Sequence, residues 1–492
     1  MTAHLPALQV VVPLVAALLC ALLRRSALAW GLTLAASWAT AAMAALLLLR
    51  VLAEGTISYH IGSWEPPWGI EYRIDVLNGL VLLLVAAVGA AIAPYARRSV
   101  AAEIAEEKQV WFYTMYLLCL TGLLGIVITG DAFNVFVFME ISSLATYVLI
   151  ALGRDRRALL SAYQYLIMGT IGATFYVIGI GFLYTMTGTL NIADMAARIG
   201  EVQSTRTVLA GTAFLTVGIC LKLALFPLHV WLPNAYAYAP SVATAFLAAT
   251  ATKVAIYLLI RIYFSIFGAA FAFEALPITE VFVVLSLAAI LGASTVAAFQ
   301  RNVKRMLAYS SVGQIGYITL GIGLASQLGL TGGIVHIVNH ALMKGALFLA
   351  MGAVAYRIGS VRLDDMAGIG RRMPLTMASF VVAGLSLIGS PGTVGFVSKW
   401  YLALAALERG WWWLVAAILL GSVIALVYIG RVVEAAYFRA PAAAAATATE
   451  APLSLLVPTW VLTAACVWFG IDTELTVGIA ARAAAFLLGA GP

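Results

Sequence analysis

Long runs of apolar residues recur along the whole chain and are separated by short polar stretches. A helix rises 1.5 Å per residue, so about twenty residues cross the hydrocarbon core of a bilayer. The apolar positions are continuous and do not alternate with polar ones, which favours helices over the strands of a barrel. The pattern therefore predicts an all-α polytopic membrane protein.

Fourteen runs are long enough to be transmembrane helices. They lie near residues 5–23, 28–52, 75–95, 111–130, 132–152, 160–186, 207–238, 241–263, 279–299, 304–325, 329–356, 374–406, 411–437 and 452–470. The first run has no basic segment before it, so we interpret it as a retained span and not as a signal peptide. The tail at 474–490 is apolar but short, which leaves an interfacial helix and a fifteenth crossing both open.

The loops differ in their content of basic residues. Alternate loops carry Arg24/Arg25, Arg97/Arg98/Lys108, Arg154/Arg156/Arg157, Arg301/Lys304/Arg305, Arg357/Arg362/Arg371/Arg372 and Arg439. Basic loops stay on the cytoplasmic side, so we expect a protein of the cell inner (plasma) membrane with both termini outside. The longest outer segment, 54–74, is expected to be an irregular loop that follows the membrane interface.

Two of the runs contain helix-breaking residues. The seventh contains Pro227 and Pro233, and the twelfth contains Gly389, Pro391 and Gly392. Such breaks are tolerated where the freed backbone faces protein or a water-lined cavity. Their spacing of five spans predicts that spans 4–8 are repeated in inverted orientation in spans 9–13.

This repeat divides the chain into four parts. They are an N-terminal three-helix segment with an outer loop (1–110), a first five-helix repeat (111–263), a second inverted five-helix repeat (279–437) and a C-terminal part of one or more helices (438–492). Each repeat is expected to form one half-channel.

Composition agrees with a membrane protein, because 63% of the residues are hydrophobic and 10% are charged, against about 45–50% and 25% in soluble domains. The net charge of +7 comes from loop arginines that face anionic lipid, so no nucleic-acid partner is expected. The four cysteines are scattered without a CxxC motif. No metal site follows from them, and the absence of any cluster or flavin motif predicts no cofactor.

Four of the six lysines fall inside apolar runs. These four are Lys222, Lys253, Lys344 and Lys399, whereas Lys108 and Lys304 are placed in loops. Arginine remains charged when buried, but the pKa of lysine can shift. The use of lysine at these depths therefore indicates groups that take up and release protons. A structural role as ion-pair partners is the alternative.

Glu140 is the one acidic residue expected deep in a span. A charge at the bilayer centre costs about 2.5–3.5 kcal/mol, so buried charges must be paired, hydrated or neutral. We hypothesise that Glu140 pairs with Lys222 and that breaking this pair releases a proton.

His336, His340 and Lys344 recur every four residues in the eleventh run. They share one helix face and extend over about 12 Å, as a proton relay requires. Haem ligation is a weak alternative, because paired axial ligands usually come from different helices. His229 lies beside the seventh-span break, where a functional role and an interface role are both open.

Six motifs resemble one known family, the antiporter-like subunits of Mrp-type cation/proton antiporters and of respiratory complex I. In order they are VFMEISSLATYVLIAL, LKLALFPLHVWLPNAYAYAPS, ATKVAIYLLIR, QRNVKRMLAYSSVGQIGYI, HIVNHALMKGALFLAMG and SPGTVGFVSKWYL. The chain is most similar to the D subunit of the Mrp-type antiporters, in the forms shared with membrane-bound hydrogenases. The resemblance implies fourteen spans and two inverted five-helix repeats with discontinuous helices 7 and 12.

The resemblance also implies roles for single residues. In the first half-channel, the residues implied in proton translocation are Glu140 in the fifth span, Lys222 in the broken seventh span and Lys253, the bridging lysine of the eighth span. In the second, they are His336, His340 and Lys344, which form the relay of the eleventh span, and Lys399, the terminal lysine. One departure is AYAYAP, where many relatives have histidine, so Tyr236 and Tyr238 leave the inner mouth without a titratable imidazole. The long lateral helix of the largest complex I subunit is also missing.

We therefore expect a proton-translocating subunit of a multisubunit Na⁺/H⁺ antiporter, a transporter component and not an enzyme. Its partners would be other hydrophobic subunits, the lipid bilayer, protons and Na⁺. The alternative is a proton-pumping subunit of a redox-driven complex, either complex I-like or a membrane-bound hydrogenase. A non-transporting scaffold is disfavoured by the buried charges.

Overall fold

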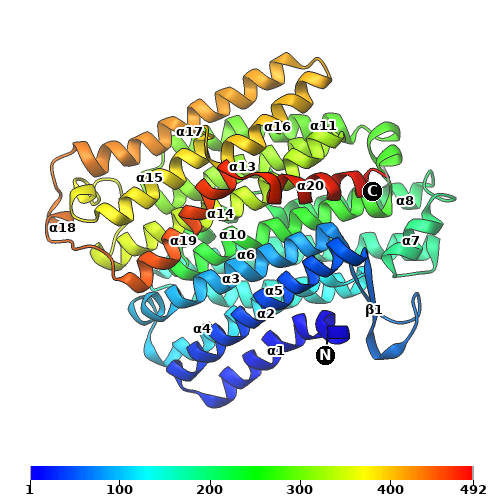
Figure 1. Cartoon of the computed structure of the whole chain (residues 1–492), viewed down its shortest axis with the longest axis horizontal. Coiled ribbons are helices and arrows are strands. Elements are labelled where there is room, and N and C mark those ends of the chain that lie inside the picture. Colours follow the sequence, from blue (N-terminus) through cyan, green and yellow to red (C-terminus); the bar gives the residue numbers. More distant parts are fainter. Residues whose placement is uncertain (1, 490–492) are drawn as a thin grey trace.

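The computed structural model describes residues 2–489, and its main feature is a bundle of long helices that run side by side (Figure 1). The first two helices lie on one flank of the bundle and α17 lies on the opposite flank. This arrangement confirms the expected all-α membrane fold.

The N-terminal part consists of three long helices and a hairpin. It comprises η1 (Thr2–His4), α1 (Leu5–Leu23), α2 (Ser26–Glu54), β1 (Ile57–His60), η2 (Ile61–Ser63), β2 (Glu71–Ile74) and α3 (Val76–Glu103). The expectation of an irregular loop at 54–74 was wrong, because β1 and β2 pair antiparallel with Ile57 opposite Ile74. Trp64 and Trp68, in the segment between the strands, remain exposed.

The next part of the chain contains the first broken helix. It comprises α4 (Glu106–Ile128), α5 (Ala132–Ala151), α6 (Arg156–Thr187), α7 (Ile192–Ile199), α8 (Arg206–Leu223), α9 (Leu232–Tyr238), α10 (Ser241–Ile260) and the π-helical η3 (Arg261–Ile266), which continues α10. The break lies between α8 and α9, as the prolines predict.

The remaining chain contains the second broken helix. It comprises η4 (Phe271–Ala275), α11 (Ile278–Leu287), η5 (Ala288–Ala293), α12 (Ser294–Ala298), α13 (Val303–Gly323), α14 (Gln327–Ile358), η6 (Ile369–Arg371), α15 (Pro374–Ile388), α16 (Val394–Glu408), α17 (Trp412–Phe438), α18 (Ala443–Ala446), α19 (Leu453–Ile471) and α20 (Glu474–Leu487). The second break lies between α15 and α16.

Within residues 2–489, twelve helices are long and apolar enough to cross a membrane. The two other expected spans correspond to α13, which carries Lys304 and Arg305 in its first turn, and to the α15–α16 pair, which is interrupted. The count of fourteen therefore stays a prediction. The 14 residues of α20 extend over only about 21 Å, so this helix alone does not cross the bilayer, and it packs against α3 and α14.

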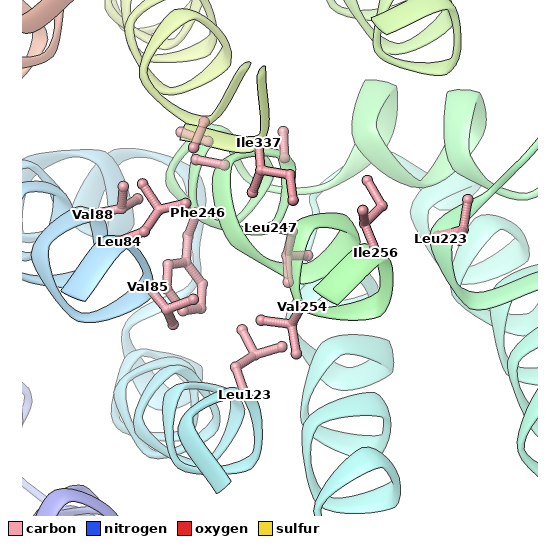
Figure 2. Packing of buried hydrophobic residues seen from close by; sticks show 14 of the residues in the cluster. Leu84, Val85, Val88, Leu123, Leu223, Phe246, Leu247, Val254, Ile256 and Ile337 are labelled. Atoms are coloured by element: carbon pink, nitrogen blue, oxygen red, sulfur yellow. The ribbon is translucent and has the colours of Figure 1, made fainter. Parts of the chain in front are cut away.

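The helices α10 and α14 form the centre of the bundle and contact each other. The apolar part of α14 is entirely buried. Figure 2 shows Phe246 of α10 beside Val85 of α3, and Val254 of α10 near Leu123 of α4. This packing keeps both central helices away from lipid.

Helices α6 and α8 approach each other closely through glycines. A Cβ atom placed on Gly218 would lie 2.6 Å from the carbonyl oxygen of Gly172, and one on Gly179 would lie 2.9 Å from that of Gly211. Small residues permit such close contact between membrane helices. The contact fixes the position of the end of α8, where Lys222 lies.

Candidate functional site

The first broken helix brings Lys222 into contact with Glu140. Helix α8 ends at Leu223 because Ala224 has a left-handed backbone conformation with φ 60°. Lys222, in the last turn, donates a hydrogen bond of 2.7 Å to Ser143 Oγ, and its Nζ lies 3.7 Å from Glu140 Oε1. Both partners belong to α5, so the two groups predicted to pair are adjacent.

The two members of this pair differ in exposure. The Glu140 side chain is 29% exposed at the surface of this chain, whereas the Lys222 side chain is 6% exposed. Behind Lys222 lies a cavity of about 40 Å³ that Ser142, Thr146 and Tyr165 line together with residues of α10. This volume has room for water, and the cavity extends from Lys222 to α10, whose wall residues there are the apolar Ala251, Val254, Ala255 and Leu258.

Lys253 lies on α10 and is fully buried. Its Nζ donates hydrogen bonds to the carbonyl oxygen of Ala248 and, at 3.4 Å, to Thr252 Oγ1. Both partners belong to its own helix. Within residues 2–489, no carboxylate forms an ion pair with Lys253 within 4 Å.

The predicted row on α14 is buried along its whole length. Lys344 donates hydrogen bonds to the carbonyl oxygen of Leu307, at 2.8 Å, and to Ser310 Oγ. His336 contacts Gln314 Oε1 through Nε2 at 3.0 Å and Ser398 Oγ through Nδ1 at 2.7 Å. The amide oxygen only accepts, so neutral His336 carries its proton on Nε2.

His340 is fully buried on α14, one turn after His336. Its ring centroid lies 6.2 Å from that of His336, and it is within electrostatic reach of Lys253 on α10 and Lys344 on its own helix. In the described chain neither ring nitrogen has a protein hydrogen-bond partner. Its two ring nitrogens are therefore available to exchange protons between these neighbours.

The second broken helix holds Lys399 by a different arrangement. Lys399 lies in α16, after the break, and its Nζ donates to the carbonyl oxygens of Leu387 (3.1 Å) and Ile388 (2.8 Å) at the end of α15. It also donates to Ser422 Oγ at 2.9 Å. Lys222 precedes its break, whereas Lys399 follows its break and satisfies the carbonyls that the break frees.

Lys304 corrects one expectation. It does not lie in a loop but in the first turn of α13, where it is buried and donates a hydrogen bond of 2.7 Å to Ser241 Oγ. Glu103 accepts from the backbone N–H and the hydroxyl of the same Ser241. Asn302 caps α13, so the sequence Asn-Val-Lys-Arg at the start of a run was a signal that Lys304 lies in a helix, although it does not indicate that the side chain is buried.

A second buried ion pair was not predicted. Arg261, at the start of η3, lies 2.5 Å from Asp75, which caps α3. Asp75 comes just before one apolar run and Arg261 near the end of another, where charged residues are common. No pattern in the sequence therefore indicates that the two side chains meet.

Comparisons with known proteins agree with this architecture. The model of the family described as NADH:quinone oxidoreductase/Mrp antiporter, TM, matches residues 129–425. The NADH-quinone oxidoreductase subunit N of Desulforudis audaxviator is 44% identical over 489 residues, which cover 96% of this chain and 97% of that protein. The D subunit of the Na⁺/H⁺ antiporter of Alkalihalophilus pseudofirmus is 32% identical, and the match covers 73% of this chain and 72% of that protein.

Two solved structures share the fold over nearly the whole chain. A chain of the Mrp complex from Dietzia sp. superposes with a TM-score of 0.90 at 27% identity, covering 99% of this chain and 97% of its own. A chain of the membrane-bound sulfane sulfur reductase, an archaeal respiratory membrane complex, superposes with a TM-score of 0.91 at 30% identity. The match covers 99% of this chain and 98% of that chain. The chain therefore belongs to the NADH:quinone oxidoreductase/Mrp antiporter transmembrane family.

Proposed function

We propose that this chain is a proton-translocating subunit of a multisubunit membrane complex that exchanges monovalent cations, in particular Na⁺, for protons. The observation that carries the proposal is the row of buried lysines and histidines that begins at the Lys222–Glu140 pair and ends at Lys399. Relatives named as the D subunit of Na⁺/H⁺ antiporters and the similarity to a chain of an Mrp complex support this function.

In this proposal the Lys222–Glu140 pair is the first gate. Separation of the carboxylate from Lys222 Nζ, now 3.7 Å away, removes the charge that favours the ammonium. Lys222 then gives its proton to water in the adjoining cavity and becomes a neutral amine. Ala251, Val254 and Ala255 of α10 line this cavity, and the titratable residue of α10 next to them in the chain, Lys253, is the next acceptor in the proposal.

The second part of the path follows α14. The proton passes from Lys253 to His340, which is within electrostatic reach of Lys253, Lys344 and His336. His336 contacts Ser398, the neighbour of Lys399 in the chain. Transfer along this line connects the central lysine with Lys399, and the two broken helices are its two ends.

The test is proton flux in membrane vesicles that contain the assembled complex. We expect Glu140→Ala and Lys222→Ala to reduce cation-driven proton movement at least about tenfold, because each leaves the other group buried without its partner. Arg198, exposed and paired with Asp194, provides a control: Arg198→Ala should leave the flux unchanged. Normal flux in both site variants would exclude the proposal.

A second candidate is a proton-pumping subunit of a redox-driven complex. It is favoured by the 44% identity, over almost the whole chain, to a protein named NADH-quinone oxidoreductase subunit N, and by the similarity to a sulfane sulfur reductase chain. Both functions use the same proton path, so the site does not separate them.

Isolation of the complex separates the two candidates. Alkalinisation of the vesicle lumen driven by Na⁺ alone, without an electron donor, supports the antiporter. Co-purification of iron–sulfur or nickel subunits, with proton movement only during electron transfer, supports the redox-driven complex.

A further inference from the structure

A cavity of about 300 Å³ lies at the end of the bundle that carries β2 and α7. We call it the vestibule and define it by Arg73, Asp75, Thr129, Ala196, Tyr257 and Arg261 among its wall residues. The side chain of Arg73 is 42% exposed, so the vestibule reaches the surface of the chain.

The inner end of the vestibule is a closed cluster of polar groups. Arg261 pairs with Asp75 at 2.5 Å through its terminal nitrogen, donates to Asn78 Oδ1, and donates from Nε to the Tyr257 hydroxyl at 3.1 Å. Its remaining nitrogen donates to Ser265 at 3.2 Å. All four side chains that hold the guanidinium line the vestibule.

Tyr257 is the member of this cluster that lies on the same helix as the buried Lys253. It is four residues after Lys253 on α10, so the two side chains share one helix face, with Cβ atoms about 5–6 Å apart. The vestibule therefore ends one helical turn from the backbone of Lys253, whose Nζ in this structure donates to the Ala248 carbonyl, in the direction away from Tyr257.

The hydroxyl of Tyr257 has no free hydrogen-bonding position. It donates to the carbonyl oxygen of Val127 at 3.0 Å and accepts from Asn78 Nδ2 at 2.7 Å and Arg261 Nε at 3.1 Å. A hydroxyl offers one proton and two lone pairs. It can accept a proton from the direction of Lys253 only after Arg261 or Asn78 moves away.

We propose that Asp75, Arg261 and Tyr257 form a second gate, which connects Lys253 directly with the water on the vestibule side. This inference rests on the proposed function. Asp75 holds Arg261 over Tyr257 and keeps the gate closed. When the ion pair loosens, the Lys253 side chain turns from the Ala248 carbonyl toward Tyr257 and gives a proton through water to the lone pair of the Tyr257 hydroxyl that Arg261 has left. The hydroxyl then releases the proton that it had donated to the Val127 carbonyl to water in the vestibule.

The π-helical geometry of η3 supports movement at this point. Arg261 is the first residue of η3, where the hydrogen bonding of α10 changes register. Such segments are rare in proteins and are frequent at functional sites. The gate therefore lies where the backbone of the central helix is least regular.

Two substitutions with opposite expected effects test the gate. Asp75→Asn keeps a side chain that can cap α3 but removes the charge that holds Arg261. We expect passive proton leak through the assembled complex to rise roughly tenfold as this charge-assisted bond is lost. Tyr257→Phe removes the relay hydroxyl and should lower driven proton flux without raising the leak.

The control is Asp194→Asn, which breaks an ion pair with Arg198 on α7; neither residue is among those that line the vestibule. It should leave both leak and flux unchanged. If Asp75→Asn lowers only the amount of assembled complex, with the leak per complex unchanged, the pair is structural and the gate is excluded.

Thiol labelling gives a second test that does not disturb the ion pair. The four native cysteines are buried, so the background of labelling is low. Ala196→Cys places a thiol in the vestibule wall, and Ala197→Cys places one on the exposed side of the same helix α7. A membrane-impermeant cationic methanethiosulfonate should inhibit flux at least about threefold in the first variant and leave the second unchanged.

The outcomes separate the gate from the proposed function. A parent complex that moves no protons contradicts the proposed function. A parent complex that moves protons, with an Ala196→Cys variant that is not labelled, or is fully labelled without loss of flux, contradicts only the gate.

Discussion

At the scale of single residues, Ser143 is a closer partner of Lys222 than Glu140 is. Its hydroxyl accepts at 2.7 Å, whereas the carboxylate lies 3.7 Å away. A hydrogen bond to a charged group contributes about 1.5–3 kcal/mol. We expect Ser143→Ala to lower the maximal proton flux roughly tenfold, because the ammonium loses the contact that fixes its position.

The matched control is Ser161→Ala on α6. The Ser161 hydroxyl is also buried and donates to the carbonyl oxygen of Arg157 within its own helix, outside the cavity, so its loss should change flux less than about twofold. Vesicle flux per assembled complex is the measurement for both, and equal rates in the two variants would remove Ser143 from the site.

Single residues also show what the sequence can and cannot predict. Lys222, Lys253, Lys344 and Lys399 are visible because a charge inside an apolar run is costly. The burial of Lys304 is not visible in the sequence. A lysine at the edge of an apolar run has the same sequence context whether its side chain meets water or turns inward to Ser241. That choice depends on how α13 packs against its neighbours.

At the scale of elements, the glycine contact between α6 and α8 sets the position of Lys222. A methyl group on Gly218 would lie 2.6 Å from the Gly172 carbonyl oxygen and 2.8 Å from the backbone nitrogen of Tyr176. Overpacking of this kind costs about 1–3 kcal/mol. We expect Gly218→Ala to lower the unfolding temperature of the purified complex in detergent by a few degrees and to reduce flux.

Gly181→Ala on α6 is the control, because a Cβ atom there meets no heavy atom within 4 Å. It should leave the unfolding temperature unchanged or raise it slightly, since alanine favours the helix over glycine. A Gly218→Ala variant as stable as the parent would show that α6 and α8 can separate without cost.

Helix breaks were predictable from proline and glycine, but the geometry around them was not. The sequence predicts interruption near Pro227 and Pro391, and α8 and α15 end at Leu223 and Ile388. It does not show that Lys399 donates to the end of α15 while Lys222 bonds across to α5. These contacts depend on which helices are neighbours in the bundle.

At the scale of the whole molecule, the distribution of loop arginines predicts the orientation in the membrane. Helix α1 begins and α20 ends at the end of the bundle where β1 and α7 lie (Figure 1). We expect this end to face the outside. In intact cells, an impermeant thiol reagent should label Glu65→Cys, between β1 and β2, but label Arg154→Cys, after α5, only after permeabilisation.

The reverse labelling pattern would invert the assignment and move both termini to the cytoplasmic side. The described native cysteines are all buried, so the parent chain serves as the unlabelled control.

The global architecture was more predictable than its details. Continuous apolar runs require helices, so the fold follows from the physics of the bilayer. The hairpin at 57–74 was not predicted, because its strands are four residues each and lie in a polar segment. The division into two repeats and the count of fourteen spans remain predictions, because α13 and the interrupted α15–α16 lack the uniform apolarity of the other spans.

The unequal placement of the two terminal lysines has a consequence for electrical behaviour. Lys222 ends the half-helix before its break, and Lys399 belongs to the half-helix after its break. Charge that travels from one lysine to the other therefore meets a different sequence of barriers from charge that travels back. The proton current through the reconstituted complex should therefore rectify: at voltages of equal size and opposite sign, the two currents should differ in size.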